Sequence, residues 1–277
     1  MLDSSIDQII HSALAEDIHY VDVTTDYLID PAQESAGRFV AKAPGVLCGL
    51  QIALRVFEIL DKDFSCTLHK QEGDAVEPGD LIMTFRGKTA SLLKAERTAL
   101  NLLQHLSGIA TMTRLCVEQT AGTKAHITDT RKTLPGLRAL QKYAVTVGGG
   151  KNHRFNLSDG VMLKDNHIDA SGGITAAVEK LRTRLGHMVK IEVETRTLTE
   201  VEEAVAANAD IIMLDNMDTQ TMAQAVQMVD GRALLEASGN MTLDRIREVA
   251  QTGVDIISLG ALTHSVTALD ISMRIDK

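Results

Sequence analysis

A regular alternation of apolar and polar segments runs through the second half of the chain. After residue 124, short apolar segments typical of strands are separated by stretches with helical periodicity. In order they are AHITDT, GVMLKD, VKIEVET, ADIIMLDN, ALLEASGN and VDIISLGA. The last four begin roughly 22 residues apart, which leaves room for one strand and one helix in each repeat. Such βα units predict a parallel sheet covered by helices.

Polar or small residues close each of these strand-like segments. They are Asp129 with Arg131, Lys164 with Asp165, Glu194, Asp215 with Asn216, Glu236 with Ser238, and Gly260. In an α/β barrel the loops after the strands gather at one mouth and carry the chemistry. We therefore expect an α/β barrel. A doubly wound open sheet is the alternative, but no G-x-G-x-x-G follows the first strand to form a dinucleotide site.

The first half of the chain has a different pattern. Residues 36–88 carry short strand-like pieces punctuated by Gly, Pro and Asp, around one helical piece, LQIALRVFEIL. This favours a small α+β unit after an N-terminal amphipathic helix. Residues 89–120 then form one long apolar helical stripe, with Gly108 as a possible break and Gly122 as a possible stop. We expect this helix to connect two domains.

Positive charge is concentrated in one segment of an acidic chain. The 277 residues carry a formal net charge of −9, yet residues 131–165 hold a local excess of Lys and Arg. The acidic remainder argues against general nucleic-acid binding, because a duplex-binding surface needs many phosphate-neutralising cations without an acidic field around them. A confined basic pocket for a small anion fits better.

Composition restricts the compartment and the kind of site. The three cysteines are an odd number without a C-x-x-C spacing, so neither a disulfide framework nor a zinc site is indicated, and we expect reduced thiols in the cytoplasm. The N-terminal stretch carries acids where a signal peptide needs a basic start. No apolar run approaches the ~18 residues of a membrane span. We therefore expect neither a membrane nor a nucleic acid among the partners.

The basic cluster follows the first two strands of the rhythmic half. Arg131, Lys132, Arg154 and Lys164 offer planar forks and point charges, which indicate a substrate with several negative groups. A solvated surface patch is the alternative. Shared loops at strand ends favour a binding site, because binding residues concentrate on loops held by a rigid scaffold.

The later strands end in acidic residues, and the last two end in small uncharged residues. Glu194 and Asp215 are placed to face the basic loops, where they would hold Mg²⁺ through water, bind vicinal hydroxyls, or act as acid and base. Glu192 has an equally good interpretation as half of an ion pair. The last two strand ends offer small residues whose backbone N–H groups suit a phosphate: Ser238, Gly239, Asn240, Gly260 and Ala261. Together these features predict a phosphorylated sugar beside an acidic co-substrate.

Seven stretches resemble one enzyme family in order along most of the chain. They are ERTALNLLQHLSGIAT, TDTRKTLPGLRALQKYAVTVGGGKNHRFNL, GVMLKDNHI, IEVE, IIMLDN, LLEASGN and ISLGALTHS. The family is quinolinate phosphoribosyltransferase (decarboxylating), a pentosyltransferase of NAD biosynthesis. The resemblance implies an N-terminal α/β sandwich over residues 1–107, with the bridging helix, and an open, about seven-stranded α/β barrel over residues 108–277. The implied reaction joins quinolinate to phosphoribosyl pyrophosphate with Mg²⁺, giving nicotinate mononucleotide, pyrophosphate and CO₂.

The resemblance also implies residue roles. The expected quinolinate pocket comprises Arg131, His153, Arg154 and Lys164. Lys132 is expected on the pyrophosphate side, and Glu194 with Asp215 near the ribose hydroxyls and the metal. The 5′-phosphate end would comprise Ser238, Gly239, Gly260 and His264. Expected catalytic residues are Lys132, Lys164, Glu194 and Asp215.

The implied assembly is a homodimer with sites shared between subunits, and association into a higher oligomer is left open. Arg97, on the long helix, resembles an arginine supplied to a neighbouring subunit's site, and the alternative is an exposed helix arginine beside Glu96.

Two competing functions are less well supported by the sequence. A related family member with another substrate is disfavoured by the complete TRKTLPGLR and NHR stretches. A catalytically silent phosphosugar-binding barrel is disfavoured because every expected site residue is present.

Overall fold

The computed structural model describes residues 4–276, which form two compact units. The first unit comprises the residues up to Met112, Leu134–Gly148 and the residues from Val266 on. The second comprises Thr113–Thr133 and Gly149–Ser265. The sequence favoured one division after residue 107; in the structure two later segments also belong to the first unit. Among the described residues, none of the helices is both long and apolar enough to cross a membrane.

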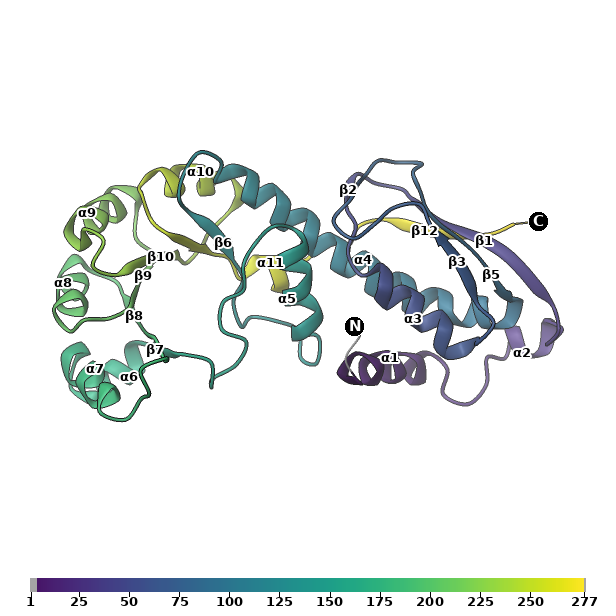
Figure 1. Cartoon of the computed structure of the whole chain (residues 1–277), viewed down its shortest axis with the longest axis horizontal. Coiled ribbons are helices and arrows are strands. Elements are labelled where there is room, and N and C mark those ends of the chain that lie inside the picture. The colour runs from purple at the N-terminus through teal and green to yellow at the C-terminus, as the bar shows by residue number, and fades with distance from the viewer. Residues whose placement is uncertain (1–3, 277) are drawn as a thin grey trace. The chain divides into compact units, whose positions relative to one another are not determined.

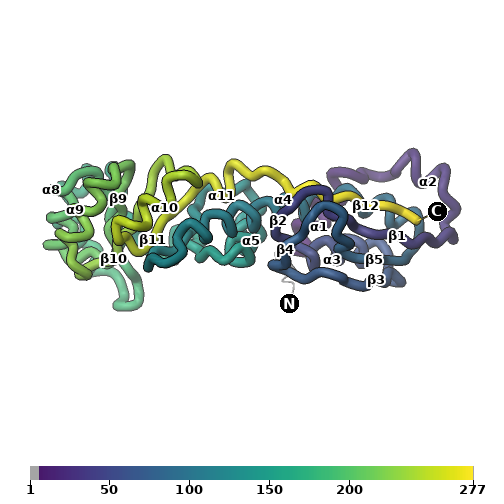
Figure 2. The backbone as a smooth tube through the Cα atoms, turned by 90° about the horizontal axis from the view of Figure 1, so that it is seen from above, coloured from purple at the N-terminus to yellow at the C-terminus, as the bar shows by residue number. Residues whose placement is uncertain are grey.

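An antiparallel four-stranded sheet organises the first unit, with strand order β12-β1-β5-β3. Strand β12 comes from the end of the chain and lies beside β1, with Val40 opposite Ser272 (Figures 1 and 2). Helices cover one face of the sheet, as expected of an α/β sandwich (Figure 1). The elements of this unit are α1 (Ser4–Asp17), α2 (Thr25–Leu28), β1 (Glu34–Ala41), β2 (Gly45–Val46), α3 (Leu50–Leu60), β3 (Ser65–Leu68), β4 (Ala75–Val76), β5 (Leu81–Lys88), α5 (Arg138–Val147) and β12 (Ile271–Ile275).

Aromatic rings fill the space between helix and sheet in the first unit. Phe57 on α3 stacks on Phe64 with ring centroids 4.9 Å apart, and it lies 5.7 Å from Phe85 of β5. Phe39 of β1 meets both Phe57 and Phe85 edge-on. Four of the five phenylalanines of the chain are thus used in one cluster, and offset and edge-on pairs of this kind stabilise a core beyond their buried area.

The long helix α4 (Thr89–Gln119) is continuous, and its residues divide between the two units. Gly108 does not break it, contrary to one expectation from the sequence. The backbone of Thr267 lies so close to the helix here that a Cβ at Gly108 would overlap its carbonyl oxygen. Gly108 is therefore required by a close backbone approach within the first unit.

Gly108→Ala should destabilise the protein although alanine favours a helix over glycine by about 1 kcal/mol. Overpacking against the Thr267 carbonyl is expected to lower the free energy of unfolding by about 1–3 kcal/mol, measured by chemical denaturation. Asn101→Ala, at an exposed position of the same helix, serves as the control and should change it by less than about 0.5 kcal/mol. A stabilised Gly108→Ala protein would contradict this account.

The second unit contains a six-stranded parallel sheet with order β6-β11-β10-β9-β8-β7. From β7 to β11 each strand adds beside the previous one, and β6 returns next to β11. The helices between them lie along the outer side, as Figure 1 shows. The elements are β6 (His126–Thr128), β7 (Val161–Leu163), α6 (Asp165–Ser171), α7 (Ile174–Arg182), β8 (Ile191–Thr195), α8 (Leu198–Ala206), β9 (Ile211–Asp215), α9 (Thr219–Val229), β10 (Leu234–Ser238), α10 (Leu243–Gln251), β11 (Ile256–Ser258) and α11 (Ala261–His264).

This strand order is compatible with an α/β barrel that is left open on one side. A doubly wound sheet would instead reverse its order at a switch point. About seven strands were expected, and six are present among the described residues. Beside β6, in place of a seventh strand, a single parallel bridge joins Lys151 to Thr128. The three glycines at 148–150, directly before Lys151, and the short pairing explain why this piece does not qualify as a strand.

Candidate active site

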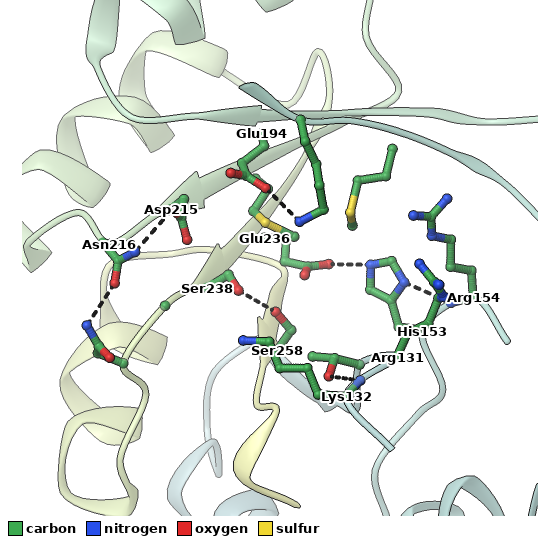
Figure 3. A pocket seen from close by; sticks show the side chains of 16 residues that line it. Arg131, Lys132, His153, Arg154, Glu194, Asp215, Asn216, Glu236, Ser238 and Ser258 are labelled. Carbon is green, nitrogen blue, oxygen red and sulfur yellow. Dashed lines mark hydrogen bonds and ion pairs between the residues drawn. The ribbon is translucent and has the colours of Figure 1, made fainter. Parts of the chain in front are cut away.

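A cavity of about 570 Å³ lies at the carboxyl ends of the strands of the second unit (Figure 3). Its lining comprises Thr130, Arg131, Lys132, His153, Arg154, Met162, Lys164, Glu194, Met213, Asp215, Asn216, Glu236, Ser238, Gly239, Asn240 and Ser258. The structure thus brings together residues from the first five strand ends, although Asp129 and Asp165 do not line this cavity. Gly260, Ala261 and His264 do not line it, although a Cβ on Gly260 would meet the side-chain stem of Lys132.

The two-residue period of a strand explains which side chains enter the cavity. On β8, Ile191 and Val193 are fully buried under the helices, so the intervening Glu192 and Glu194 point to the inner side. The parallel register continues this layer, because Glu194 lies opposite Met213 and Asp215 lies opposite Ser238. An ordinary apolar outer face and a polar inner face therefore arise from the same strands.

The basic side of the cavity holds like charges close together. Arg154 donates a hydrogen bond from Nη1 to the Gly160 carbonyl at 2.8 Å, which fixes its guanidinium. Burial and the neighbouring Arg131 lower the pKa of Arg154. Lys132 is anchored through its backbone, since its carbonyl accepts a hydrogen bond from Thr263 Oγ1 at 2.8 Å. Two neighbouring guanidinium groups repel, so an anion with two carboxylates would relieve the repulsion.

The acidic side lies across the same cavity. Glu194 pairs with Lys164 at 3.1 Å, and its side chain is only 10% exposed. Asp215 accepts a hydrogen bond from Asn216 Nδ2 at 3.0 Å, and Asn216 in turn accepts one from Asn240 Nδ2 at 3.0 Å. This chain of bonds ties the loop after β10 to the carboxylate that ends β9.

Small residues form the third side, after β10 and β11. Ser258 donates a hydrogen bond to Ser238 at 3.1 Å. Gly239 has a φ of +88°, and a Cβ there would overlap the side chain of Asn216. Only glycine satisfies both conditions, so the backbone after β10 stays uncovered where a phosphate could approach it.

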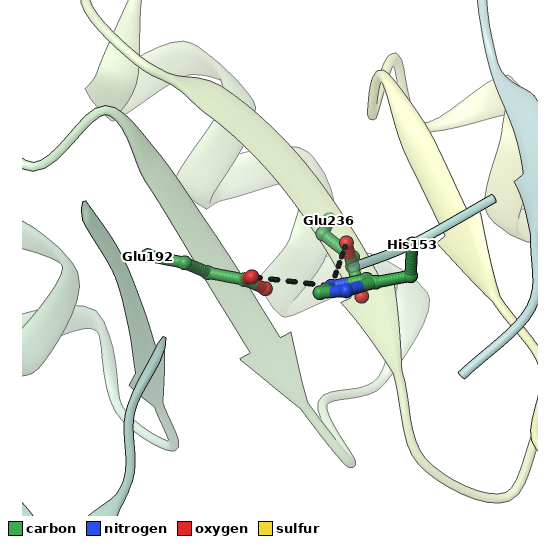
Figure 4. A group of neighbouring side chains, drawn as sticks. All are labelled: His153, Glu192 and Glu236. Carbon is green, nitrogen blue, oxygen red and sulfur yellow. Dashed lines mark ion pairs between the residues drawn. The ribbon is translucent and has the colours of Figure 1, made fainter. Parts of the chain in front are cut away.

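A buried group of three side chains forms the floor of the cavity (Figure 4). Nε2 of His153 lies 3.1 Å from Glu192 Oε2 and 3.5 Å from Glu236 Oε2. Both carboxylates are at most 4% exposed. Burial raises the pKa of Glu192. Burial lowers the pKa of His153, whereas hydrogen bonds to Glu192 and Glu236 raise it. The Arg154 backbone N–H that points at Nδ1 favours the neutral ring and opposes this rise.

Two places in the site have ligands that suit a divalent cation. His153, Glu192 and Glu236 can converge on one ion. However, Nδ1 of His153 accepts a hydrogen bond from the Arg154 backbone N–H at 2.8 Å, so Nε2 carries the ring proton and has no free lone pair. Metal-bound histidines instead donate from their second nitrogen. The pair Glu194 and Asp215 fits Mg²⁺ better, because Mg²⁺ is usually held by one or two carboxylates plus substrate oxygens and water.

Models of one protein family match almost the whole chain. The description "Quinolinate phosphoribosyl transferase, N-terminal domain" covers residues 22–107, and the corresponding C-terminal domain covers residues 109–274. The chain belongs to the quinolinate phosphoribosyl transferase family. The resemblance noted in the sequence is thereby confirmed.

Individual members of the family are similar over nearly their full length. A "probable nicotinate-nucleotide pyrophosphorylase [carboxylating]" of Bacillus subtilis is 47% identical over 260 residues, which are 94% of this chain and 90% of that protein. A quinolinate phosphoribosyltransferase [decarboxylating] of Nicotiana tabacum is 42% identical, over 97% of this chain and 81% of its own. The solved nicotinate-nucleotide pyrophosphorylase of Francisella tularensis superposes with a TM-score of 0.95 at 38% identity, covering 100% of this chain and 98% of the other.

Several lining residues were not singled out from the sequence. Ser258 belongs to this group, as does Arg196 just outside the lining, whereas Glu236 and Asn216 were noted at strand ends but given no role. For Glu236 a signal existed, because it lies two positions before Ser238 and therefore on the same face of the strand. An ion pair was one of two equal interpretations of Glu192, and in the structure its partner is His153. Arg97 is exposed on α4 in the first unit.

Removing the imidazole of His153 should leave the carboxylates of Glu192 and Glu236 buried without their partner. We expect His153→Ala to lower the free energy of unfolding by about 3–5 kcal/mol, because it leaves buried charges without a partner. Denaturant titration measures the change. The control is the triple variant that combines His153→Ala with Glu192→Gln and Glu236→Gln. It should recover much of the lost free energy of unfolding, because the buried charges are removed as well. A cost below about 1 kcal/mol for His153→Ala alone would contradict the proposed pairing.

Proposed function

We propose that this protein transfers the phosphoribosyl group of phosphoribosyl pyrophosphate to the ring nitrogen of quinolinate, with loss of CO₂. The products are nicotinate mononucleotide, pyrophosphate and CO₂, as in de novo NAD biosynthesis. One observation carries the proposal beyond family membership: a single cavity has a basic side for a dicarboxylate and an acidic side for a ribosyl cation.

The basic side is the proposed quinolinate pocket. Arg131 and Arg154 would each bind one carboxylate, and Lys164 would add a point charge. Both ring nitrogens of His153 are engaged with protein groups, so we assign His153 to fixing the Arg154 backbone and to the charge balance beneath the substrate. Enclosure strengthens each of these electrostatic contacts relative to water.

The acidic side is the proposed donor subsite. Glu194 and Asp215 would bind the ribose hydroxyls and stabilise positive charge at the anomeric carbon as pyrophosphate leaves. Lys132 would bind the leaving pyrophosphate. The 5′-phosphate is proposed to lie at Ser238, Gly239 and Asn240, and near Gly260, Ala261 and His264. Mg²⁺, held by Glu194 and Asp215 directly or through water, would neutralise part of the pyrophosphate charge.

For the decarboxylation step the protein mainly has to hold the substrate carboxylates in position. Once the pyridine nitrogen carries the ribose, it is cationic. The bond between the ring and the 2-carboxylate can then break with its electrons remaining on C2, next to that charge, and a proton subsequently replaces CO₂. The ring is thus its own electron sink, and the basic residues serve to hold the carboxylates in place.

Assembly and compartment complete the proposal. We propose a homodimer in which Arg97 enters the partner's site, with further association of dimers left open, and a cytoplasmic location. The three cysteines are free, which suits a reducing compartment.

The reaction is tested by supplying purified protein with phosphoribosyl pyrophosphate, Mg²⁺ and either quinolinate or nicotinate. Release of CO₂ and pyrophosphate in the mixture with quinolinate, but not in the mixture with nicotinate, supports the proposal. Arg131→Ala should weaken quinolinate binding by about 1.5–3 kcal/mol, the strength of a charge-assisted contact, with a much smaller effect on phosphoribosyl pyrophosphate. Calorimetric titration of both ligands measures this. Arg182→Ala, outside the cavity, is the control. Equal losses for both ligands would remove the assignment.

The shared site is tested by mixing two inactive proteins. Arg97→Ala and Arg131→Ala subunits, dissociated and reassembled together, form heterodimers in which one site carries both lesions and the other carries neither. Random mixing makes about half the dimers heterodimers, so activity should return to about a quarter of wild type. Subunit exchange is verified with a tag on one partner. No recovery despite exchange would mean that Arg97 does not act across the interface.

A further inference from the structure

Three consecutive strand ends of the second unit direct a carboxylate toward one guanidinium. Arg196, two residues after Glu194, contacts Asp165 at 2.9 Å and Glu194 at 3.6 Å, and its Nε lies 3.9 Å from Asp215. These carboxylates come from the ends of β7, β8 and β9. Arg196 is not among the site residues expected from the sequence.

The local fold holds Arg196 in this place. Glu200 accepts hydrogen bonds from the backbone N–H groups of Arg196 and Thr197, and the Thr197 hydroxyl accepts one from the Glu200 N–H at 3.2 Å. This reciprocal cap begins α8 and fixes the loop from which the arginine extends. The guanidinium is 55% exposed, so it covers the solvent side of the two acids, which are 10% and 20% exposed.

A second cavity of about 230 Å³ lies on the outer side of this contact. Arg196 and Glu194 both line it, together with further carboxylates that include Asp169 and Glu203. Arg196 is the one basic residue among the described residues of that lining. Without it, Glu194 would keep its pair with Lys164 at 3.1 Å, whereas Asp215 would lose its contact with a guanidinium.

We propose that Arg196 is a positioning residue that serves as the built-in counter-ion of Glu194 and Asp215 and competes with a divalent cation for them. This inference rests on the proposed donor subsite. A fixed positive charge within 4 Å of both carboxylates holds them in one arrangement against their mutual repulsion and opposes a second cation at the same oxygens. The acid pair thereby avoids binding metal tightly before the anionic donor brings additional ligands.

The test measures Mn²⁺ binding in the absence of substrates, from the electron paramagnetic resonance signal of the free ion. Arg196→Gln should bind Mn²⁺ about tenfold more tightly than wild type, because one repelling charge is removed. Arg196→Lys keeps the charge and should remain close to wild type. Arg182→Gln is the matched control, since Arg182 forms a comparable exposed pair with Asp210 at 2.7 Å.

Asp215→Asn separates this inference from the proposed subsite. In the Arg196→Gln background, Asp215→Asn should abolish the gain in Mn²⁺ affinity. If that double variant keeps the gain, the ion binds elsewhere, and both the metal assignment and the counter-ion role fall. If Asp215→Asn weakens binding but Arg196→Gln binds no more tightly than wild type, only the counter-ion role is overturned. No measurable binding to either wild type or Arg196→Gln also overturns it.

Discussion

The charge arrangement of the site depends on the buried contact among His153, Glu192 and Glu236. Carboxylates are tolerated inside a sheet only when a partner offsets the loss of solvation. Here one imidazole serves two carboxylates from non-adjacent strands, and its second nitrogen receives the Arg154 backbone N–H. The same contact thus stabilises the interior of the open barrel and orients the strand-end loop that carries a proposed substrate arginine.

Opposite charges remain separated above this floor because each occupies the end of a different strand. Arg131 and Arg154 belong to the loops that flank the open edge, whereas Glu194 and Asp215 end two neighbouring strands of the sheet interior. Lys164 bridges the two sides through its pair with Glu194.

The sequence predicted those parts of the fold and site that depend on local periodicity. The βα rhythm identified the parallel sheet, and residues at strand ends, such as Lys164 and Asp215, line the cavity as expected. Features that depend on distant backbone segments were missed. Gly108 looked like a helix break because the approach of Thr267, far along the chain, has no local signal. Arg196 was not singled out, because its partners come from three separate strand ends.

The pairing of β12 with β1 has a consequence for the order of events during synthesis. The central strand β1 emerges from the ribosome early, but its neighbour β12 lies at residues 271–275, after the whole second unit. At about 5–20 residues per second, β1 waits on the order of tens of seconds with an unpaired edge. An unpaired edge is open to pairing with other chains. The nascent first unit is therefore the part of this molecule that most depends on protection by chaperones, and the second unit, complete before β12 is made, can fold ahead of it.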